Sequence, residues 1–389
     1  MIICEAEKCS GCSLCYNVCP TRCIEMKYDV NGALSPVVDE SVCIRCMVCR
    51  DSCIANNKIS FSPPIKLFAG WSLIKDDRKS SSSGGAASVF SSKMIEKGGY
   101  VFGAGFSDHL QLKHYCAGTP EQLKGFKGSK YFQSYIGDAY TLAAKHLHDG
   151  KPVLFVGSPC QVWALRRFVG SEDENLVAVD FVCHGVPSQK YIDEYIEYLT
   201  PSLPSPPDSI SFRVSQHYIF QLFKEGKTVF SNSYEDDIFL NGFFCGVYHR
   251  DSCYRCPFAQ KNRASDITIG DFWGLGKNVA FQHDQADGVS LIMANTTKGL
   301  SYIESCADRL FLEQRSVEEA VQGNSQLSGP VPVSKARIAF KNNYKKKGFV
   351  RSAQCYLNRK KRANARSDRI SAVKRFIKHC LSIGEKTFL

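Results

Sequence analysis

Apolar and polar residues alternate in blocks along most of the chain, and these blocks predict its helices and strands. Short apolar runs typical of buried strands occur at residues 100–106, 152–156 and 176–182. Helical stretches lie between them, as at residues 134–148 and 189–199. Strands that alternate with helices favour an α/β domain built on a substantial sheet. A proline-rich stretch at residues 201–207 predicts a loop within this domain.

The first sixty residues follow a different pattern. Two strand-like runs within residues 24–38 flank Asn31 and Gly32, which predicts a β-hairpin. Further on, Pro63 and Pro64 mark a boundary. We therefore expect a small α+β domain, a larger α/β domain and a helical tail, over residues 1–60, 61–330 and 331–389.

The composition suggests a cellular setting. With 389 residues and 44% hydrophobic content, the chain can form two or three domains with proper cores. No apolar run approaches the ~18 residues that span a bilayer, and Met1 leads into the first cysteine motif without a signal peptide. The 19 cysteines therefore predict a reducing, cytoplasmic environment, in which thiols bind metal more often than they form disulfides.

The net charge of +11 is concentrated in the tail. Residues 331–389 hold 17 Lys and Arg against Asp368 and Glu385, so this segment carries +15 and the first 330 residues sum to −4. Residues 369–381 place apolar side chains such as Phe376 and Ile377 on one helical face and basic side chains elsewhere. Such a helix docks on an anionic membrane surface, here the inner membrane face, or on an acidic protein. The alternative is a solvated tail.

Nucleic acid is not an expected partner. The positive charge is confined to the tail, and no recognised nucleic-acid module accompanies it.

The cysteines of the first domain form two regular combs with the spacing x2-x2-x3. They comprise Cys9, Cys12, Cys15 and Cys19, followed by Pro20, and then Cys43, Cys46, Cys49 and Cys53. In such a comb three thiolates bind one [4Fe-4S] cluster and the fourth reaches a neighbouring cluster. The combs therefore predict two [4Fe-4S] clusters close together. The alternative is a pair of zinc sites, which also use cysteine quartets.

The order comb, hairpin, comb resembles bacterial two-cluster ferredoxins. In those proteins each fourth cysteine serves the other cluster. The resemblance therefore implies that Cys53 completes the first site and that Cys19 completes the second. The sequence departs from the ferredoxin pattern at Ile54, because the second comb lacks the proline that follows Cys19.

Loops of the second domain carry further candidate chemistry. A Ser/Gly stretch at residues 80–88 precedes a helix expected near Val89. Its glycines and the helix start would bring backbone N–H groups to an anion, although flexible linkers share this composition. The strand at 152–156 leads into a tight loop at residues 157–161, a common ligand position in α/β folds.

Six motifs of this region, in order, resemble the beta-subunit family of coenzyme F420 hydrogenases and dehydrogenases. They are Ser83-Gly84-Gly85, KYFQS at 130–134, GSPCQ at 157–161, CHGVPS at 183–188, Cys253-x2-Cys256 and SDITIGDFWG at 265–274. The resemblance covers roughly residues 1–330 and leaves the basic tail outside. It implies an α/β flavin-binding domain that holds FAD, preceded by a ferredoxin-like two-cluster domain.

Residue roles carried over from the family follow the motifs. The residues implied to surround the flavin or its phosphates are Ser83, Gly84, Gly85, Lys130, Ser158 and Gln161. A third cluster would be held by Cys160, Cys183, Cys253 and Cys256. Alternatively, Cys160 and Cys183 are small buried hydrophobes, and Cys116 and Cys245 are substitute ligands. The cysteines interpreted as plain thiols are Cys4, Cys23, Cys306, Cys355 and Cys380.

Two side chains are candidates for catalysis. His184 would donate a proton to a reduced substrate, because imidazole titrates near neutral pH. Asp271, together with Asp266, would approach the flavin or the substrate. In each case a structural hydrogen bond is the competing interpretation.

Together these features predict a ferredoxin-type iron–sulfur, FAD-dependent oxidoreductase that passes electrons between the clusters, FAD and an organic substrate. Its redox partner would be reduced ferredoxin or a deazaflavin. Resemblance to bacterial relatives found with surface-polysaccharide biosynthesis genes implies a nucleotide- or lipid-linked sugar as substrate. The alternatives are a coenzyme F420 dehydrogenase and a non-catalytic electron-transfer subunit of a larger complex.

Overall fold

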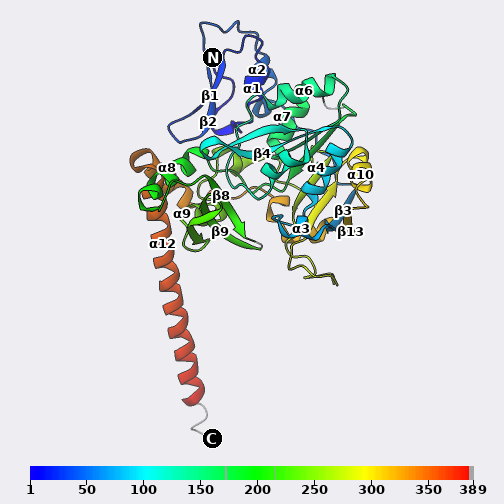
Figure 1. The fold of residues 1–389 in the computed structure, drawn as a ribbon. Helices are drawn as coiled ribbons and strands as arrows, with labels where there is room; N and C mark the ends of the chain where they lie inside the picture. The colour runs from blue at the N-terminus through cyan, green and yellow to red at the C-terminus, as the bar shows by residue number, and fades with distance from the viewer. Residues whose placement is uncertain (171–172, 215, 385–389) are drawn as a thin grey trace.

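The computed structural model describes residues 1–170, 173–214 and 216–384, without the side chains of Asp108 and of residues 367–384. Figure 1 shows a small N-terminal domain seated on a larger body, from which the last helix projects. Among the described residues, no helix is long and apolar enough to cross a membrane.

The N-terminal domain contains the predicted hairpin. Strands β1 (Ile24–Tyr28) and β2 (Leu34–Val38) pair antiparallel, which confirms the hairpin. In its turn, the Asp29 carboxylate accepts hydrogen bonds from the backbone N–H groups of Asn31 (2.8 Å) and Ala33 (2.9 Å). Each comb also contains one short helix, α1 (Leu14–Asn17) or α2 (Val48–Asp51). The domain is thus a repeat of two similar halves.

The larger body is built on an eight-stranded mixed sheet with the order β13-β3-β12-β11-β7-β6-β4-β5. The neighbours β11, β7, β6 and β4 are parallel, and the flanking strands pair antiparallel. The strands span β3 (Lys66–Ser72), β4 (Tyr100–Ser107), β5 (Gln111–Ala117), β6 (Val153–Gly157), β7 (Leu176–Phe181), β11 (Ile267–Asp271), β12 (Ser290–Ala294) and β13 (Leu310–Gln314).

Helices cover both faces of this sheet. Helices α4 (Ala86–Glu96) and α10 (Thr297–Glu304) pack on one face, and α6 (Ala139–His148) and α7 (Pro159–Val169) pack on the other. The first comb joins the α6 and α7 side, where Leu14 is buried in the same cluster. Shorter helices complete this body: α3 (Lys75–Lys79), α5 (Pro120–Leu123) and α11 (Val317–Gly323).

A second core lies beside the main sheet. It is formed by α8 (Gln189–Leu199), α9 (Ile238–Phe244) and a three-stranded antiparallel sheet of β8 (Ser209–Val214), β9 (His217–Lys224) and β10 (Lys227–Ser233). The elements predicted at 100–106, 152–156, 176–182 and 189–199 are present. The predicted helix at 134–148 begins later, at Ala139.

The last helix, α12 (Lys335–Gly384), belongs partly to this second core. It is interrupted at Gly348, and the carboxylate of Glu194 on α8 accepts hydrogen bonds from the backbone N–H of Phe349 (2.7 Å) and the hydroxyl of Tyr344 (2.9 Å). Residues 335–357 pack against α8 and α9, with Phe349 fully buried. The interpretation of everything after residue 330 as a basic appendage is therefore corrected, since this stretch completes the core.

The rest of α12 extends away from the body (Figure 1). The apolar face predicted at residues 369–381, including Phe376 and Ile377, lies outside the residues whose side chains the structure describes.

Candidate functional site

The first comb is held against the larger body by side chains that bind its backbone. The guanidinium of Arg250 donates to the carbonyl oxygen of Cys9 at 2.8 Å. The amide of Gln133 donates to the carbonyl oxygens of Ser10 and Gly11, each at 3.0 Å. The backbone of this loop is therefore fixed relative to the main sheet.

Gly11 makes this approach possible. It has a φ of +65°, and a Cβ at this position would lie 2.6 Å from the Gln133 amide nitrogen and 2.8 Å from Nη1 of Arg250. A neighbouring contact continues the docking, because the buried hydroxyl of Tyr140 donates to the carbonyl oxygen of Cys12 at 2.9 Å.

The structure brings the thiols of the first site together. Burial raises the pKa of Cys15 well above its ordinary value, and the nearby charges of Cys12, Cys9 and Cys53 raise it further. Cys4 joins them, since hydrogen bonds with Cys53 and Cys9 raise its pKa. The fourth cysteine of the second comb therefore lies with the first comb, in the crossed arrangement that the ferredoxin resemblance implies.

The second site combines three cysteines of the second comb with the fourth cysteine of the first comb. A small cavity is lined by Cys19, Cys43, Cys46 and Cys49. The thiol of Cys23 lies there as well, with its sulfur 3.4 Å from that of Cys19. Both Cys4 and Cys23, expected to be plain thiols, thus lie within the two thiol clusters. Cys46 is solvent-exposed, so this site faces outward.

A third group of thiols forms between the first comb and the body. Burial raises the pKa of Cys183 well above its ordinary value, and the charges of Cys253, Cys160 and Cys256 contribute. Cys12 of the first comb interacts electrostatically with Cys160. The three groups therefore follow one another in space: second comb, first comb, then this group.

The proposed substitute ligands lie elsewhere. Cys116 is on β5 and its sulfur is 3.8 Å from the His146 ring. Cys245 follows α9, with its sulfur 3.0 Å from the Lys360 ammonium nitrogen. Neither residue joins the third thiol group.

Single metal ions and clusters require different arrangements of thiolates. In the described part of the chain, no three His, Cys, Asp or Glu side chains converge closely enough to hold one metal ion. A zinc site draws four thiolates to about 2.3 Å from one centre. A [4Fe-4S] cluster instead takes one thiolate at each of four separate iron atoms. All eighteen cysteines with described side chains are free thiols.

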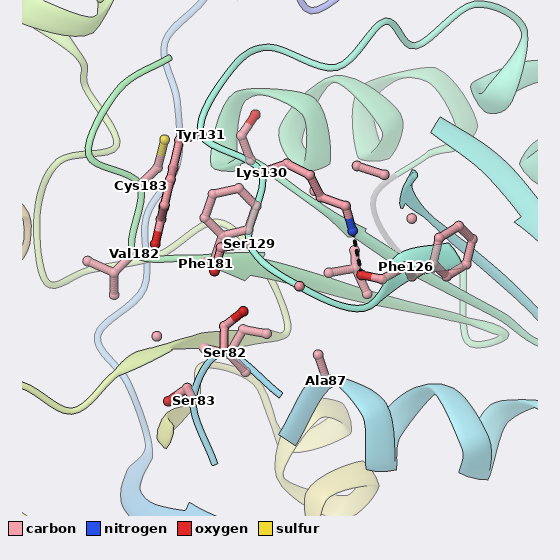
Figure 2. A pocket seen from close by; sticks show the side chains of 18 of the residues that line it. Ser82, Ser83, Ala87, Phe126, Ser129, Lys130, Tyr131, Phe181, Val182 and Cys183 are labelled. Atoms are coloured by element: carbon pink, nitrogen blue, oxygen red, sulfur yellow. Dashed lines mark hydrogen bonds between the residues drawn. The ribbon is translucent and has the colours of Figure 1, made fainter. Parts of the chain in front are cut away.

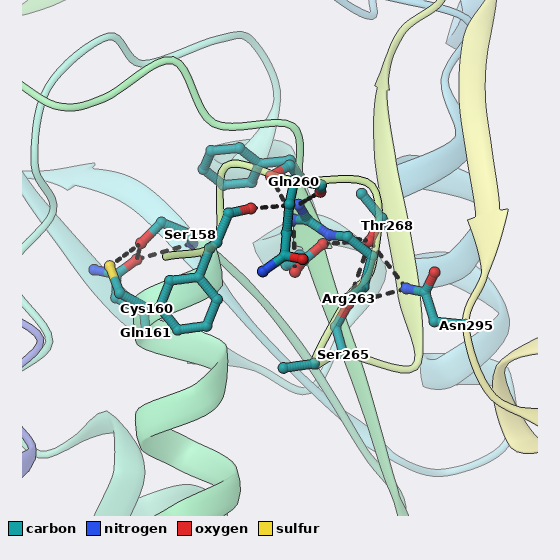
Figure 3. Close-up of polar contacts among 12 residues, drawn as sticks. Ser158, Cys160, Gln161, Gln260, Arg263, Ser265, Thr268 and Asn295 are labelled. Atoms are coloured by element: carbon teal, nitrogen blue, oxygen red, sulfur yellow. Dashed lines mark hydrogen bonds and ion pairs between the residues drawn. The ribbon is translucent and has the colours of Figure 1, made fainter. Parts of the chain in front are cut away.

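A buried ion pair lies between the loops that carry the third group (Figure 3). Arg263 pairs with Asp180 at 2.8 Å, and both side chains are 2% exposed. Arg263 also donates to the carbonyl oxygens of Phe258 (2.9 Å), Gln260 (3.2 Å) and Phe181 (3.4 Å). These carbonyls follow Cys256 and precede Cys183, so one side chain connects both loops.

Next to the third group lies a cavity of about 380 Å³. It lies at the carboxyl ends of the central parallel strands, where Gly157, Phe181 and Asp271 line it. Ligands of α/β folds bind at this edge of the sheet. Cys160 and Cys183 also line the cavity, so the third thiol group borders it directly.

Two helix N-termini face this cavity. Gly85, with a φ of +87°, precedes α4, and no side chain caps the helix there. At α7, Ser158 and Gln161 form a capping box, in which the side-chain amide oxygen of Gln161 accepts hydrogen bonds from the backbone N–H (3.0 Å) and the hydroxyl (2.9 Å) of Ser158. The positive ends of both helix dipoles thus favour an anion in the cavity.

Lys130 supplies a cationic side chain to the same cavity. Its ammonium donates to the carbonyl oxygens of Phe126 (2.7 Å) and Lys127 (2.9 Å), and no carboxylate of a described residue pairs with it. Burial lowers the pKa of Lys130 to about 7. Figure 2 shows Lys130 reaching toward Phe126, with Ala87 of α4 below it and Cys183 on the far side.

Gly84 does not line the cavity. It is packed against the main sheet, where a Cβ would lie 2.4 Å from the carbonyl oxygen of Gly70. Its neighbour Ser83 does line the cavity, and its hydroxyl donates to the carbonyl oxygen of Val289 at 3.0 Å. The predicted flavin contact of Gly84 is therefore indirect at most, because the close approach that needs glycine is to β3 (Lys66–Ser72).

Both predicted catalytic candidates line the cavity. His184 lies beside Trp273, with ring centroids 5.0 Å apart, and burial lowers the pKa of His184 to about 4. The Asp271 carboxylate forms an ion pair with Arg213 at 2.7 Å. Asp266, in contrast, accepts a hydrogen bond from the backbone N–H of Ala178 and does not line the cavity. Because its pKa of about 4 lies well below 7, His184 is neutral at physiological pH.

Comparison with known proteins agrees with this arrangement. Residues 150–320 match the family described as the C terminus of the coenzyme F420 hydrogenase/dehydrogenase beta subunit, and residues 8–57 match the 4Fe-4S dicluster domain. The resemblance inferred from the six motifs is thereby confirmed.

Among solved structures, a chain of the F420-reducing [NiFe] hydrogenase complex from Methanosarcina barkeri, studied by xenon derivatization, is similar in fold. It is 17% identical, the alignment covers 70% of this chain and 93% of that chain, and the TM-score is 0.48. The comparison with curated proteins gives no match.

Several residues around the cavity and at its junction with the first comb were not found from the sequence. Gln133 lines the cavity and also binds the first comb, and Arg250 lies at the same junction. His114 lines the cavity too, with its ring nitrogens 2.9 Å from the Ser134 hydroxyl and 3.0 Å from the carbonyl oxygen of Val156. Only the KYFQS motif, which contains Gln133 and Ser134, pointed toward this region.

Proposed function

We propose that the chain is an iron–sulfur flavoprotein oxidoreductase that holds two [4Fe-4S] clusters in its N-terminal domain, a third beside the cavity and FAD within the cavity. The single observation that carries this proposal is the alignment of three thiol groups that ends at the cavity. When bound, the clusters would supply single electrons and the flavin would convert them to two-electron chemistry.

The thiol sets fit such clusters in number and in surroundings. Four thiols from the combs gather at each N-terminal site, and the third set comes from three loops. Burial raises the pKa of Cys253 to about 12 and of Cys256 to about 11. Since only thiolates ligate iron, loading this site would release protons.

The cavity fits a dinucleotide with an anionic centre. The uncapped N-terminus of α4 and the ammonium of Lys130 would bind a pyrophosphate, and the capping box at Ser158 and Gln161 would keep α7 in place. His184 would lie near the reacting end of the flavin. It would be a neutral imidazole there. Arg213 would hold the Asp271 carboxylate in place through their ion pair.

We propose an organic substrate on the open side of the cavity, in particular a sugar carried on a nucleotide or lipid. One wall of the cavity on this side is formed by aromatic side chains from the region of the second core: Tyr131, Tyr218, Phe243 and Phe244. Aromatic faces suit flat or apolar ring surfaces. The same wall suits a deazaflavin, which makes coenzyme F420 dehydrogenase the second candidate.

Electrons would enter at the second comb. Cys46 is exposed, and exposed apolar side chains surround it: Val42 (48%), Ile44 (65%) and Val48 (40%). A redox protein such as reduced ferredoxin would bind this surface, since apolar patches of this kind serve transient protein contacts.

Iron, sulfide and flavin analysis of anaerobically purified protein tests the proposal. About twelve irons and one FAD per chain are expected from three four-iron clusters. In the variant Cys183→Ser about four irons should be lost while the N-terminal clusters keep their spectra. Cys306→Ala, a buried thiol outside every group, is the matched control. Eight irons in the wild type would remove the third cluster, and absence of flavin would refute the enzyme.

Steady-state assays separate the candidates. Flavin bleaching by reduced deazaflavin would support the F420 dehydrogenase. If no organic acceptor is reduced until another subunit is added, the chain is an electron-transfer subunit and the catalytic proposal fails.

A further inference from the structure

Arg250 lies at the junction between the first comb and the third thiol group. It follows β10 and α9 in the chain and directly precedes the Cys253 loop. Its guanidinium donates to the backbone carbonyl oxygen of Cys9 at 2.8 Å and to the side-chain amide oxygen of Gln133 at 3.0 Å. The Cys9 thiol also accepts a hydrogen bond from it.

This arginine is a buried cation without a carboxylate partner among the described residues. Three of the described arginines are buried as whole residues, and the other two are paired: Arg263 with Asp180 at 2.8 Å, and Arg337 with Asp251 at 2.9 Å. The carboxylate next in sequence to Arg250, Asp251, is taken by Arg337 and Lys341. Arg250 itself is only 7% exposed.

A buried charge needs an opposite charge nearby, because burial without one is strongly unfavourable. The groups around Arg250 that can become anionic are cysteines. Its guanidinium binds the main chain at Cys9, and its own carbonyl oxygen accepts a hydrogen bond from the backbone N–H of Cys253 at 3.0 Å. Cys9 belongs to the first thiol group and Cys253 to the third.

We propose that Arg250 is the countercharge shared by the first and third clusters, and that it raises the reduction potential of both. The inference rests on the proposed cluster sites. Each cluster takes up one electron on reduction, so its reduced state is more negative and a fixed cation stabilises that state. Arg250 is therefore a positioning residue that also sets the energy of the electron at the junction.

The test is an anaerobic redox titration followed by electron paramagnetic resonance on the purified full-length protein. In Arg250→Gln, which keeps a polar side chain but removes the charge, the midpoint potentials of the first and third clusters should become more negative. The second cluster, bordered by Cys19, Cys43, Cys46 and Cys49, should shift less. Arg250→Lys, which keeps the charge, should restore most of the loss.

Arg255→Gln is the matched control. Arg255 pairs with Glu7 across the same interface at 3.0 Å but is 64% exposed, so its loss should leave all potentials unchanged. Unchanged potentials in Arg250→Gln at full iron content would overturn the proposal. If Arg250→Gln fails to retain iron, retention by Arg250→Lys supports the need for charge, and failure of both variants contradicts it. A wild type with eight irons would instead refute the proposed third cluster before any variant is measured.

Discussion

The ion pair between Asp180 and Arg263 gives the sharpest test of how the third thiol group is held. In Asp180→Asn the shape of the side chain is kept, but the Arg263 cation loses its partner in a site where both side chains are 2% exposed. Leaving one member of a buried pair uncompensated costs about 3–5 kcal/mol. At about 2 °C per kcal/mol for a chain of this size, the Tm should fall by roughly 6–10 °C.

The double variant Asp180→Asn, Arg263→Met adds a second, independent readout. A buried ion pair contributes little net stability, because the cost of removing both charges from water offsets their attraction. Removing both charges should therefore cost less than removing Asp180 alone. The iron of the third site should nevertheless be lost, because the loops that follow Cys256 and precede Cys183 are no longer connected by Arg263.

Thermal unfolding by circular dichroism and iron analysis, both under anaerobic conditions, measure these two effects. Glu96→Gln is the control, since Glu96 pairs with Arg309 at the surface and its loss should cost at most about 1 kcal/mol. Two results would contradict the reasoning: Asp180→Asn within about 1 kcal/mol of the wild type, or a double variant that is no more stable than Asp180→Asn alone.

Three further predictions follow from buried side chains. Phe349→Ala should destabilise the protein by about 3–5 kcal/mol in urea unfolding, whereas a free appendage would tolerate it. His114 has a pKa of about 4 in the folded chain, lowered by burial from 6.5. The unfolded chain therefore binds the proton first, and up to about 3 kcal/mol of stability should be lost as the pH falls from 6.5 to 4. The Tm of His114→Gln should depend less steeply on pH in that window; an equal slope would contradict the assignment. Because the ammonium form of Lys130 exists below its pKa of about 7, FAD binding by flavin-free protein should weaken as the pH rises through 7. Fluorescence titration of Lys130→Met should show weaker binding without this pH dependence.

Local patterns were sufficient for part of the fold. The hairpin is formed within one short segment, so the strand-like runs on either side of Asn31 and Gly32 are sufficient to predict it. The strand ending at Gly157 was also identified from its apolar run. The three-stranded sheet of β8 to β10 was not, because part of its burial comes from the packing of α12, which is more than a hundred residues away in the sequence.

Charge was a misleading guide to the tail. Phe340, Tyr344 and Phe349 are buried although lysines surround them in the sequence. The net charge of residues 331–389 combines a first part that packs in the second core with a second part that extends away from the body, so it does not distinguish them. Periodicity within the first half alone would have separated them.

Candidate site residues were found where a motif carried them. The cavity residues Ser83, Lys130, Ser158 and Gln161 all came from family motifs. Arg250 and Gln133 act through contacts across more than a hundred residues, and neither has a spacing that signals its role. Long-range contacts of this kind require the folded chain.

The docking of the first comb has a consequence for how the chain can be rearranged. Arg250, Gln133 and Tyr140 all donate to main-chain carbonyl oxygens of residues 9–12, and of this loop's side chains only the Cys9 thiol is bound by Arg250. Every amino acid presents a carbonyl, so the interface reads the path of the loop and the cysteine that any cluster loop must keep. A two-cluster module from another protein should therefore dock in the same way if it keeps glycine at the Gly11 position, the same loop path, and the side chains of Leu14 and Asn17 that also contact the body. Grafting such modules would change the reduction potentials of the N-terminal clusters, where electrons would enter, while the cavity stays unchanged.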